Sequence, residues 1–269
     1  MIQIGILGCG TIGSALARAV VQKFPAVARL AYVSDRHPEQ ILKLRSRLKP
    51  VKIKAVSVSE LIRKSDFIIE AASVKASEEI VPLVLAAGKS ILVLSVGGIL
   101  RIKKLPDLLK RSKGSLHIPS GAVAGIDGVL AARTGGIESV QITTRKPLKG
   151  LMHAPYFIKK GFQAGKIKKP TLIFEGNAEA AIRNFPENIN VAVTLSLAGI
   201  GARKTRVRIF TSPTYRYNMH EIQIQSGYGQ IVTQVINLPS RENPKTSALA
   251  IGSAIAALEK IFSPIKIGT

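Results

Sequence analysis

The glycine-rich segment Gly8-Cys9-Gly10-Thr11-Ile12-Gly13 has the spacing G-x-G-x-x-G. It follows an apolar run, Ile2–Leu7, and leads into Ile12–Lys23, where apolar residues recur at helical spacing. In this strand–turn–helix setting the first glycine permits a tight turn, the second lets the backbone approach a pyrophosphate, and the third allows close helix–strand packing. The helix N-terminus adds N–H groups and a positive dipole. We therefore expect a dinucleotide, NAD or NADP, to be bound by Gly8, Gly10, Thr11, Ile12 and Gly13.

An acidic residue follows the glycines where a dinucleotide-binding unit needs one for the adenosine ribose. Asp35 ends the second expected strand, about 20 residues beyond the motif. Its carboxylate favours the 2′-hydroxyl of NAD, whereas the neighbouring Arg36 is suited to stack on adenine or to hold the 2′-phosphate of NADP. We expect both cofactors to be used, with NAD binding at least as well. The alternative is that Asp35 only forms a turn.

Small residues end two later strands of the same region. Ala71 and Ala72 follow one apolar run and Ser95 ends the next. Ligands of open α/β sheets lie beyond the carboxyl ends of the strands, so these three residues are expected to leave room for the nicotinamide half of the cofactor. Ordinary tight turns explain them equally well.

One of the four histidines, His220, lies in surroundings suited to catalysis. It begins an alternating segment, between Asn218 and Glu221, and a histidine at a strand entrance can face a cleft. An ordinary imidazole pKa of about 6.5 suits proton transfer near neutral pH. Metal binding is not favoured, because no second His, Cys or carboxylate stands at ligand spacing.

Polar residues at the start of the last expected helix are suited to bind an anion. Lys245, Thr246 and Ser247 follow Pro244 directly. Backbone N–H groups and the dipole of a helix start attract carboxylates. The other interpretation, that Thr246 or Ser247 simply caps the helix, is compatible with binding.

The composition excludes several classes of protein. With 269 residues, 46% of them hydrophobic and 20% charged, the chain is long and apolar enough for one large or two small folded domains. The single cysteine, Cys9, cannot form an internal disulfide, which favours a reducing compartment. Neither a secretory leader nor an apolar run of membrane-spanning length is present, so we expect a cytoplasmic protein.

The charge balance is unusual, with a formal net charge of +23. It indicates either a polyanionic partner or an anionic substrate and cofactor. Apolar residues interrupt each basic cluster, as expected for the solvated faces of ordered elements; the clusters are Lys43–Lys54, Arg101–Lys113, Lys159–Lys169 and Arg203–Arg208.

Strands and helices alternate in the first part of the chain. The expected strands are Ile2–Leu7, Arg29–Ser34, Lys52–Val56, Phe67–Ala71 and Ser90–Ser95. The expected helices between them are Ile12–Lys23, Glu39–Leu48, Ser59–Lys64 with Ser59 as N-cap, and Ala76–Ala87. This order predicts βαβ units and a doubly wound parallel sheet, the Rossmann architecture.

The pattern changes after residue 119. Alternation predicts half-buried strands, as in Arg206-Val207-Arg208-Ile209, within Gln141–Arg145, Leu172–Gly176, Arg203–Thr211, Glu221–Ser226 and Gly229–Leu238. Helices are expected at Ala178–Asn184, Asn190–Leu197 and Ser247–Ile261. The fold class is therefore α/β: a Rossmann domain over 1–119, completed by 241–269, and an α+β substrate domain with a mixed or antiparallel sheet over 120–240.

Six segments in order resemble the L-aspartate dehydrogenase family of NAD biosynthesis. Besides Gly8–Gly13, the resemblance is carried by Pro119–Gly125, Phe174–Ala178, Phe185–Ala192, Asn218–Ile222 and Asn243–Ala250. The glycine motif is shared by many dehydrogenases, whereas the other five together are much more specific.

The resemblance implies a cytoplasmic homodimer that converts L-aspartate, NAD(P)+ and water into oxaloacetate, ammonia and NAD(P)H through iminoaspartate. It implies that His220 is the catalytic residue and that Asn190 and either Ala122 or Ala124 contact the cofactor. Together with the residues at the start of the last helix, we expect the substrate to be bound by Ser120, Asn190, His220, Lys245, Thr246 and Ser247.

Two other functions fit parts of the sequence. A dehydrogenase of homoserine dehydrogenase-like architecture has the same cofactor motif. A Rossmann-based nucleic-acid-binding or redox-sensing regulator would explain the basic clusters. Against the regulator, no helix-turn-helix or zinc motif is evident, tryptophan is absent, and aromatic residues make up only 5% of the chain.

Overall fold

The structure is a computed structural model that describes residues 1–185, 189–240, 242–243 and 246–268. It divides into two compact units. The first comprises Met1–Pro119 and Ile251–Lys266, and the second comprises Ser120–Ala250 with the end of the chain.

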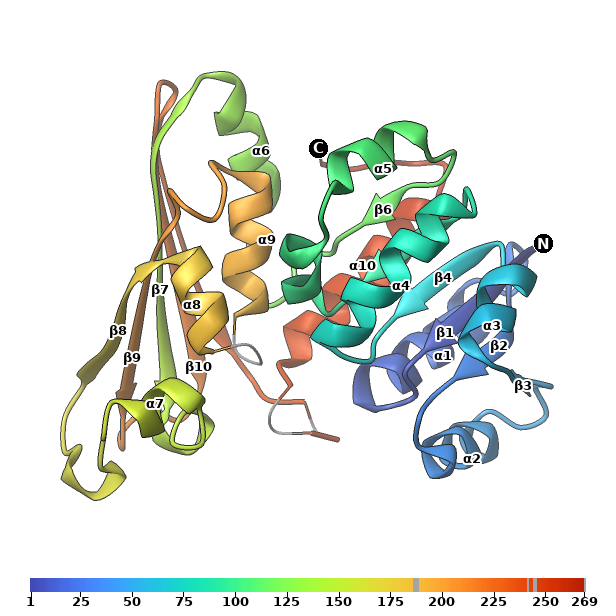
Figure 1. Cartoon of the computed structure of the whole chain (residues 1–269), viewed down its shortest axis with the longest axis horizontal. Helices are drawn as coiled ribbons and strands as arrows, with labels where there is room; N and C mark the ends of the chain where they lie inside the picture. The colour runs from blue at the N-terminus through green and yellow to red at the C-terminus, as the bar shows by residue number, and fades with distance from the viewer. Residues whose placement is uncertain (186–188, 241, 244–245, 269) are drawn as a thin grey trace. The chain divides into compact units, whose positions relative to one another are not determined.

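The first unit is a six-stranded parallel sheet with the order β3-β2-β1-β4-β5-β6. Helices lie on both faces of this sheet (Figure 1). The strands are β1 (Ile2–Leu7), β2 (Ala28–Ser34), β3 (Lys54–Ala55), β4 (Phe67–Glu70), β5 (Ser90–Val93) and β6 (Leu116–His117). The helices are α1 (Thr11–Lys23), α2 (Pro38–Arg47), α3 (Val58–Lys64), α4 (Val74–Ala86), α5 (Leu105–Arg111), the 3₁₀ helix η1 (Val96–Arg101) and most of α10 (Ala248–Phe262). The predicted doubly wound sheet is confirmed, and its strand order reverses direction at β1.

Burial on both faces explains why the strands of this sheet are continuous apolar runs. β4, with the sequence FIIE, is buried at every position. The chain-terminal helix α10 supplies Ala254 and Leu258, both fully buried, to the core cluster around β1 and α1. The Phe262 ring lies edge-on to Phe24 and Phe67, with centroid distances of 5.3 and 5.9 Å.

The second unit is a five-stranded sheet with the order β11-β10-β7-β9-β8. The β7–β9 pair is parallel and the other pairs are antiparallel, so the expected mixed sheet is confirmed. The strands are β7 (Ile137–Pro147), β8 (Thr171–Asn177), β9 (Arg206–Ser212), β10 (Asn218–Ser226) and β11 (Gly229–Asn237). The helices are α6 (Ile126–Thr134), α7 (Pro155–Lys159), α8 (Ala178–Asn184) and α9 (Asn190–Ala198), with 3₁₀ turns η2 (Leu148–Gly150) and η3 (Ala164–Lys166).

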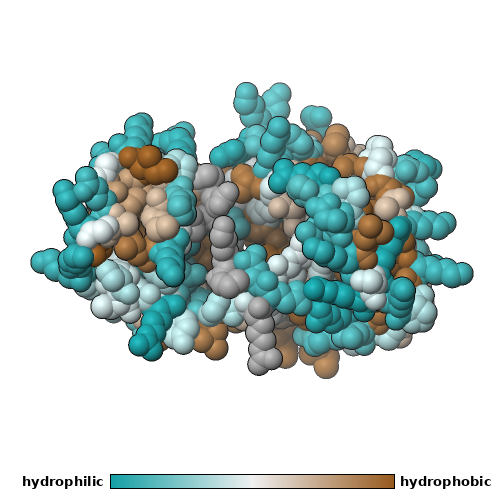
Figure 2. Space-filling model, turned by 90° about the horizontal axis from the view of Figure 1, so that it is seen from below, coloured by the Kyte–Doolittle hydropathy of each residue, from teal (hydrophilic) through white to brown (hydrophobic). Residues whose placement is uncertain are grey.

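Helices α6, α8 and α9 lie against one face of this sheet (Figure 1). We call that face the inner face and the opposite one the outer face. Residues alternate accordingly: Val207 and Ile209 of β9 are buried, while Arg206 is exposed and Arg208 partly exposed, as predicted. In the space-filling view, hydrophilic residues make up most of the visible surface (Figure 2). The Lys and Arg residues of the four basic clusters are exposed, apart from Arg45 and Arg208, which are partly exposed, so the clusters are solvated faces as expected.

Some boundaries differ from the sequence-based expectations. The N-cap of α3 is Ser57, whose hydroxyl accepts a hydrogen bond from the Glu60 N–H at 3.3 Å, so the assignment of Ser59 was wrong. β3 is shorter than expected, and β7 is longer at both ends. Within the described residues no helix is long and apolar enough to cross a membrane.

Candidate functional site

Two glycines of the Gly8–Gly13 turn are required by the protein itself. Gly8 has φ +94°, and a Cβ there would lie 2.6 Å from the Ala71 carbonyl oxygen at the end of β4. A Cβ on Gly13 would lie 1.8 Å from the carbonyl oxygen of Gly8, so only glycine allows α1 to pack this closely against the turn. The structure thus confirms the roles expected for the first and third glycines.

Gly10 is different, because nothing in the protein requires a glycine there. Its φ of −69° suits any residue, and an added Cβ would meet no protein atom within 4 Å. Gly10 is the N-cap position of α1, where no side chain forms a capping hydrogen bond and the first turn holds no acidic residue. Open space over an uncapped helix start fits the pyrophosphate of a dinucleotide.

Asp35 lies beside this turn at the end of β2. Its Oδ2 accepts a hydrogen bond from the Cys9 N–H at 2.6 Å, and its Oδ1 accepts one from the His37 N–H at 2.8 Å. The side chain is partly exposed, and each carboxylate oxygen has a further lone pair for a ribose hydroxyl. The exposed Arg36 side chain instead donates from Nε to His37 Nε2 at 3.0 Å.

Glu70 is a residue of this region that the sequence reasoning missed. It is fully buried at the end of β4, and its carboxylate accepts hydrogen bonds from the N–H groups of Ala72 (2.8 Å), Ser73 (3.1 Å) and Ser95 (3.0 Å). Burial raises the pKa of this carboxyl, and the hydrogen bonds oppose the rise. Glu70 therefore joins the loops after β4 and β5, which contain the predicted cofactor residues Ala71, Ala72 and Ser95.

In the second unit, His220 lies near the start of β10 on the inner face. It pairs directly with Thr144 of β7, and its Nδ1 is 3.0 Å from Thr144 Oγ1. When Nδ1 carries the proton it donates to this hydroxyl, which leaves the Nε2 lone pair for chemistry. Thr144 thus orients the imidazole, and sequence reasoning did not single it out.

The environment of His220 differs from what the sequence suggested. The residue is only 4% exposed, so the expectation of a cleft-facing histidine with an ordinary pKa was wrong. Burial, and secondly the charge of Lys146, lowers the pKa of His220 to about 3. The imidazole is therefore neutral at neutral pH.

Strand β11 holds the segment around Ala122 and Ala124. The Asn237 Nδ2 donates to the Ala122 carbonyl oxygen at 3.0 Å, and the Thr233 hydroxyl donates to that of Ala124 at 3.2 Å. Asn237 also accepts a hydrogen bond from the Ser247 hydroxyl at 2.6 Å. This buried amide thus connects a predicted cofactor segment with a predicted substrate residue. Of the two alanines, Ala122 is buried and Ala124 is exposed, which favours Ala124 as the cofactor contact.

The remaining predicted site residues are spread over the second unit. Ser120 and Thr246 are partly exposed, as is Asn190, the first residue of α9. Lys245 lies outside the described residues. Where side chains are described, no three His, Cys, Asp or Glu residues are grouped to hold a metal ion.

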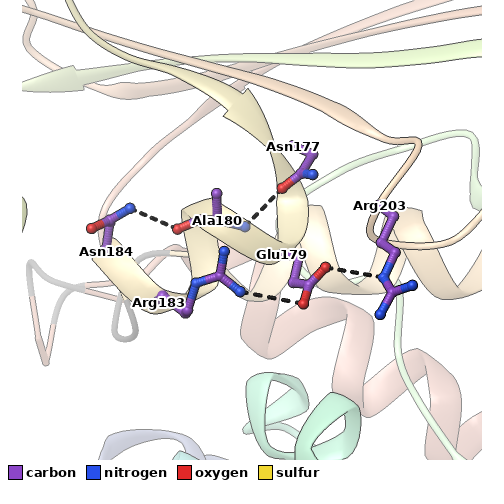
Figure 3. A network of polar contacts seen from close by, with 6 residues as sticks. All are labelled: Asn177, Glu179, Ala180, Arg183, Asn184 and Arg203. Carbon is purple, nitrogen blue, oxygen red and sulfur yellow. Dashed lines mark hydrogen bonds and ion pairs between the residues drawn. The ribbon is translucent and has the colours of Figure 1, made fainter.

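Helix α8, which precedes Asn190 in the chain, is fixed at its start by a polar network (Figure 3). Asn177 caps it by accepting from the Ala180 N–H at 2.8 Å. The Glu179 carboxylate accepts from Arg183 at 3.2 Å and from Arg203, which precedes β9, at 3.3 Å. The network ties α8 to the loop before β9.

Two family models match the chain and together span nearly all of it. The model described as homoserine dehydrogenase, NAD binding domain, matches residues 8–119, and the one described as aspartate dehydrogenase, C-terminal, matches residues 127–261. The first match identifies the cofactor as a nicotinamide dinucleotide, which confirms the prediction of NAD or NADP.

Curated relatives are similar over their whole length. The chain is 46% identical to the L-aspartate dehydrogenase of Methanosarcina barkeri, and the alignment covers 100% of both chains. It is 38% identical to L-aspartate dehydrogenase 3 of Bordetella bronchiseptica, with 99% of this chain and 97% of the relative covered. Among solved structures, it is similar to aspartate dehydrogenase from Thermotoga maritima, with 25% identity, a TM-score of 0.72 and full coverage of both chains.

Proposed function

The chain belongs to the aspartate dehydrogenase family, and we propose that it oxidises L-aspartate with NAD(P)+ and water to oxaloacetate and ammonia through iminoaspartate. The observation that carries the proposal is the match of residues 127–261 to the aspartate dehydrogenase C-terminal domain, because this part contains His220 and Asn190. The cofactor-binding domain alone is common to many dehydrogenases.

In this proposal, different residues bind the pyrophosphate, the adenosine ribose and the nicotinamide of the cofactor. The Gly8–Gly13 turn and the start of α1 bind the pyrophosphate, supported by the open space over Gly10. Asp35 binds the adenosine ribose. Ala71, Ala72 and Ser95 are the proposed nicotinamide contacts of the first unit, and Ala124 and Asn190 are those of the second. When bound, NAD(P)+ supplies the acceptor for the hydride that leaves the substrate Cα.

His220 is the proposed acid–base catalyst. Oxidation requires the substrate amine to be neutral, and Nε2 of an imidazole oriented through Nδ1 by Thr144 is suited to take a proton from the substrate ammonium. Once this proton has been released to solvent, the same nitrogen can activate the water that attacks the imine carbon. Both steps require His220 to begin as the free base, which is its state when buried.

The two substrate carboxylates are proposed to meet the polar groups around the start of α10. Thr246 and Ser247 directly precede α10, and Lys245, Ser120 and Asn190 are the further candidates. The hydrogen bond from Ser247 to Asn237 supports a fixed backbone at this point. The positive net charge of +23 attracts both a dicarboxylate and a dinucleotide.

We also propose a homodimer formed through the outer face of the second sheet. No helix of the described chain covers this face in Figure 1, and Val232 and Ile236 on the outer side of β11 are 57% and 56% exposed. Light scattering coupled to size-exclusion chromatography tests whether the protein is a dimer. An increase in the monomer fraction of the Ile236→Lys variant would place the interface on the outer face.

The single cysteine supports a cytoplasmic location, and the iminoaspartate formed in the proposed reaction would serve NAD biosynthesis.

A substrate panel tests the proposed reaction. Purified protein is incubated with L-aspartate, L-homoserine or L-alanine and each of NAD+ and NADP+, and the reduced cofactor is followed by absorbance. The proposal requires kcat/KM for L-aspartate to exceed the others by at least tenfold. A preference for homoserine would favour the alternative dehydrogenase, and no turnover together with a salt-sensitive shift of DNA on a gel would favour the regulator.

A further inference from the structure

Asn237, the last residue of β11, hydrogen-bonds two segments that are far apart in the chain. Its Nδ2 donates to the carbonyl oxygen of Ala122 at 3.0 Å, and its Oδ1 accepts from the Ser247 hydroxyl at 2.6 Å. The side chain is buried. Asn237 lies in none of the six segments that carry the family resemblance, yet it joins two of them, 119–125 and 243–250. One amide thus links part of the proposed cofactor site with part of the proposed substrate site.

The first of these segments is held against β11 at a second point. The Thr233 hydroxyl donates to the Ala124 carbonyl oxygen at 3.2 Å, and alternation along the strand puts Thr233 on the same face as Asn237. Gly125 packs directly on Thr233, because an added Cβ would lie 2.9 Å from Thr233 Cγ2. The carbonyl groups of Ala122 and Ala124 are therefore both positioned by β11.

The second segment is held by the residues that follow β11. The Ser240 N–H donates to the Thr246 carbonyl oxygen at 2.7 Å, and Ser247 forms an isolated bridge with Pro239. The Ser247 side chain is buried, and its hydroxyl donates to Asn237. The end of β11 and the residues after it therefore position the polar groups that directly precede α10.

The two bonds explain why this position needs an amide side chain. A carbonyl oxygen only accepts hydrogen bonds, so Ala122 requires the amide N–H of Asn237, and Oδ1 then faces the Ser247 hydroxyl. If either segment moved away, a buried polar atom of Asn237 would lose its partner, which is unfavourable. The positions of the two segments are therefore energetically linked.

The same end of β11 lies close to the predicted catalytic histidine. Asn237 pairs with Asn218 of β10, and Val235, two residues earlier on the same face, pairs with His220. Hydride transfer and proton transfer both require the ligands to be held accurately, and a small error of position lowers the rate strongly. A residue that fixes two ligand-binding segments at once is suited to this need.

We propose that Asn237 is a positioning residue that couples the two ligands: a cofactor bound at segment 121–125 stabilises the arrangement of segment 246–248 that binds the substrate, and the substrate does the reverse. The inference rests on the proposed oxidation of aspartate and on the assignment of Ala124 and Ser247 to it. Asn237 acts through these segments and touches neither ligand. Such coupling is reciprocal, so each ligand raises the affinity for the other by the same factor.

The binding of NADH with and without L-aspartate measures this coupling. Because NADH is already reduced, it accepts no hydride from the substrate, and both ligands stay bound without turnover. The Kd for NADH is measured by its fluorescence, first alone and then with saturating L-aspartate. We expect L-aspartate to lower the Kd for NADH of the wild type at least about fivefold.

Two matched asparagine variants separate coupling from folding. Asn237→Ala removes both hydrogen bonds, and in this variant L-aspartate should change the Kd for NADH by less than about twofold. Asn184→Ala is the control, because Asn184 also donates from Nδ2 to a backbone carbonyl, that of Ala180 at 2.9 Å, but belongs to α8 (Figure 3). It should keep the wild-type factor. If Asn237→Ala does not fold, Asn237→Asp, which loses the donor to Ala122 and keeps the acceptor, gives the same comparison.

Steady-state kinetics give a second readout that a merely structural role would not produce. In Asn237→Ala the KM for L-aspartate should rise by about the factor that is lost from the coupling. The Kd for NADH alone should stay within about threefold of the wild type, because the proposed pyrophosphate and ribose contacts belong to the first unit. A loss of folded protein would instead lower the apparent kcat and leave KM unchanged.

The outcomes distinguish this inference from the proposed function. A wild type that oxidises L-aspartate but shows no coupling, or an Asn237→Ala variant that keeps the wild-type coupling, would overturn the role of Asn237 alone. An equal loss of coupling in Asn237→Ala and Asn184→Ala would also overturn it, because any loosening of the second unit would then suffice. A wild type without turnover of L-aspartate would overturn the function itself.

Discussion

Replacing Gly10 with alanine separates cofactor binding from folding. The added Cβ meets no protein atom within 4 Å, and φ −69° is allowed for alanine. The loss of glycine at an N-cap costs a few tenths to about 1 kcal/mol, and the reduced entropy of the unfolded chain returns about 0.4–1 kcal/mol. We therefore expect the free energy of unfolding to change by less than about 1 kcal/mol.

The same methyl group lies where the pyrophosphate must approach the backbone. We expect the Kd for NAD+ to rise at least tenfold, which corresponds to a loss of about 1.4 kcal/mol of binding free energy. Isothermal titration calorimetry measures the Kd, and urea unfolding measures the stability of the same preparation. Weak binding by a fully stable variant is the predicted combination.

Gly13→Ala is the matched comparison. Its Cβ would lie 1.8 Å from the Gly8 carbonyl oxygen, so the turn and α1 must move apart, and we expect a loss of stability of about 2 kcal/mol or more. Wild-type affinity for NAD+ in Gly10→Ala would refute the assignment of this turn to the pyrophosphate.

Three further predictions concern His220 and Asp35. His220→Asn should lower kcat by about 10²–10⁴ while the Kd for NAD+ is unchanged, and an unaltered kcat would remove His220 from the mechanism. The Kd for NAD+ should be no higher than that for NADP+, and Asp35→Ser should shift the ratio towards NADP+; exclusion of NAD+ by the wild type would contradict the role of Asp35. The pKa of His220, about 3, lies below its ordinary value of about 6.5, so the unfolded chain binds more protons between these values and stability should fall as the pH falls through this interval. Urea unfolding at pH 7 and pH 5 should show a smaller decrease for His220→Asn than for the wild type.

Most of the first unit was predictable because five of its six strands gave a local signal in the sequence, whereas the two-residue strand β6 gave none and was not predicted. Buried parallel strands such as Phe67–Glu70 are apolar at nearly every position, and the glycine motif fixes the turn after β1. Ser57 and Ser59 stand two positions apart where a helical segment begins, and only the structure shows which hydroxyl accepts the Glu60 N–H. Propensity alone does not separate two serines so close together.

The second unit was predicted less accurately at the ends of its strands. β7 begins at Ile137, but its exposed residues Glu138 and Ser139 carry no strand signature, so the alternation could be recognised only from Gln141 onward. The register that pairs His220 with Thr144 depends on two strands 76 residues apart, which no local pattern reveals.

The missed residues of the site are all defined by distant partners. Glu70 is indistinguishable in sequence from an acidic residue in a turn until Ser95, in the loop after the neighbouring strand β5, is seen to donate to it. Asn237 ends a strand, as many asparagines do, and its bonds to Ala122 and Ser247 arise from tertiary packing. The identity of His220 as a candidate came from sequence, whereas its burial did not.

Transfer of a hydrogen label from the substrate to the cofactor tests the central claim most directly. The protein is incubated with NAD+ and L-aspartate that carries deuterium at Cα, and the reduced cofactor is analysed by mass spectrometry. We predict that the reduced cofactor contains the deuterium and that oxaloacetate and ammonia form in equal amounts. Reduced cofactor without the label, or no reduction with either NAD+ or NADP+, would contradict the account.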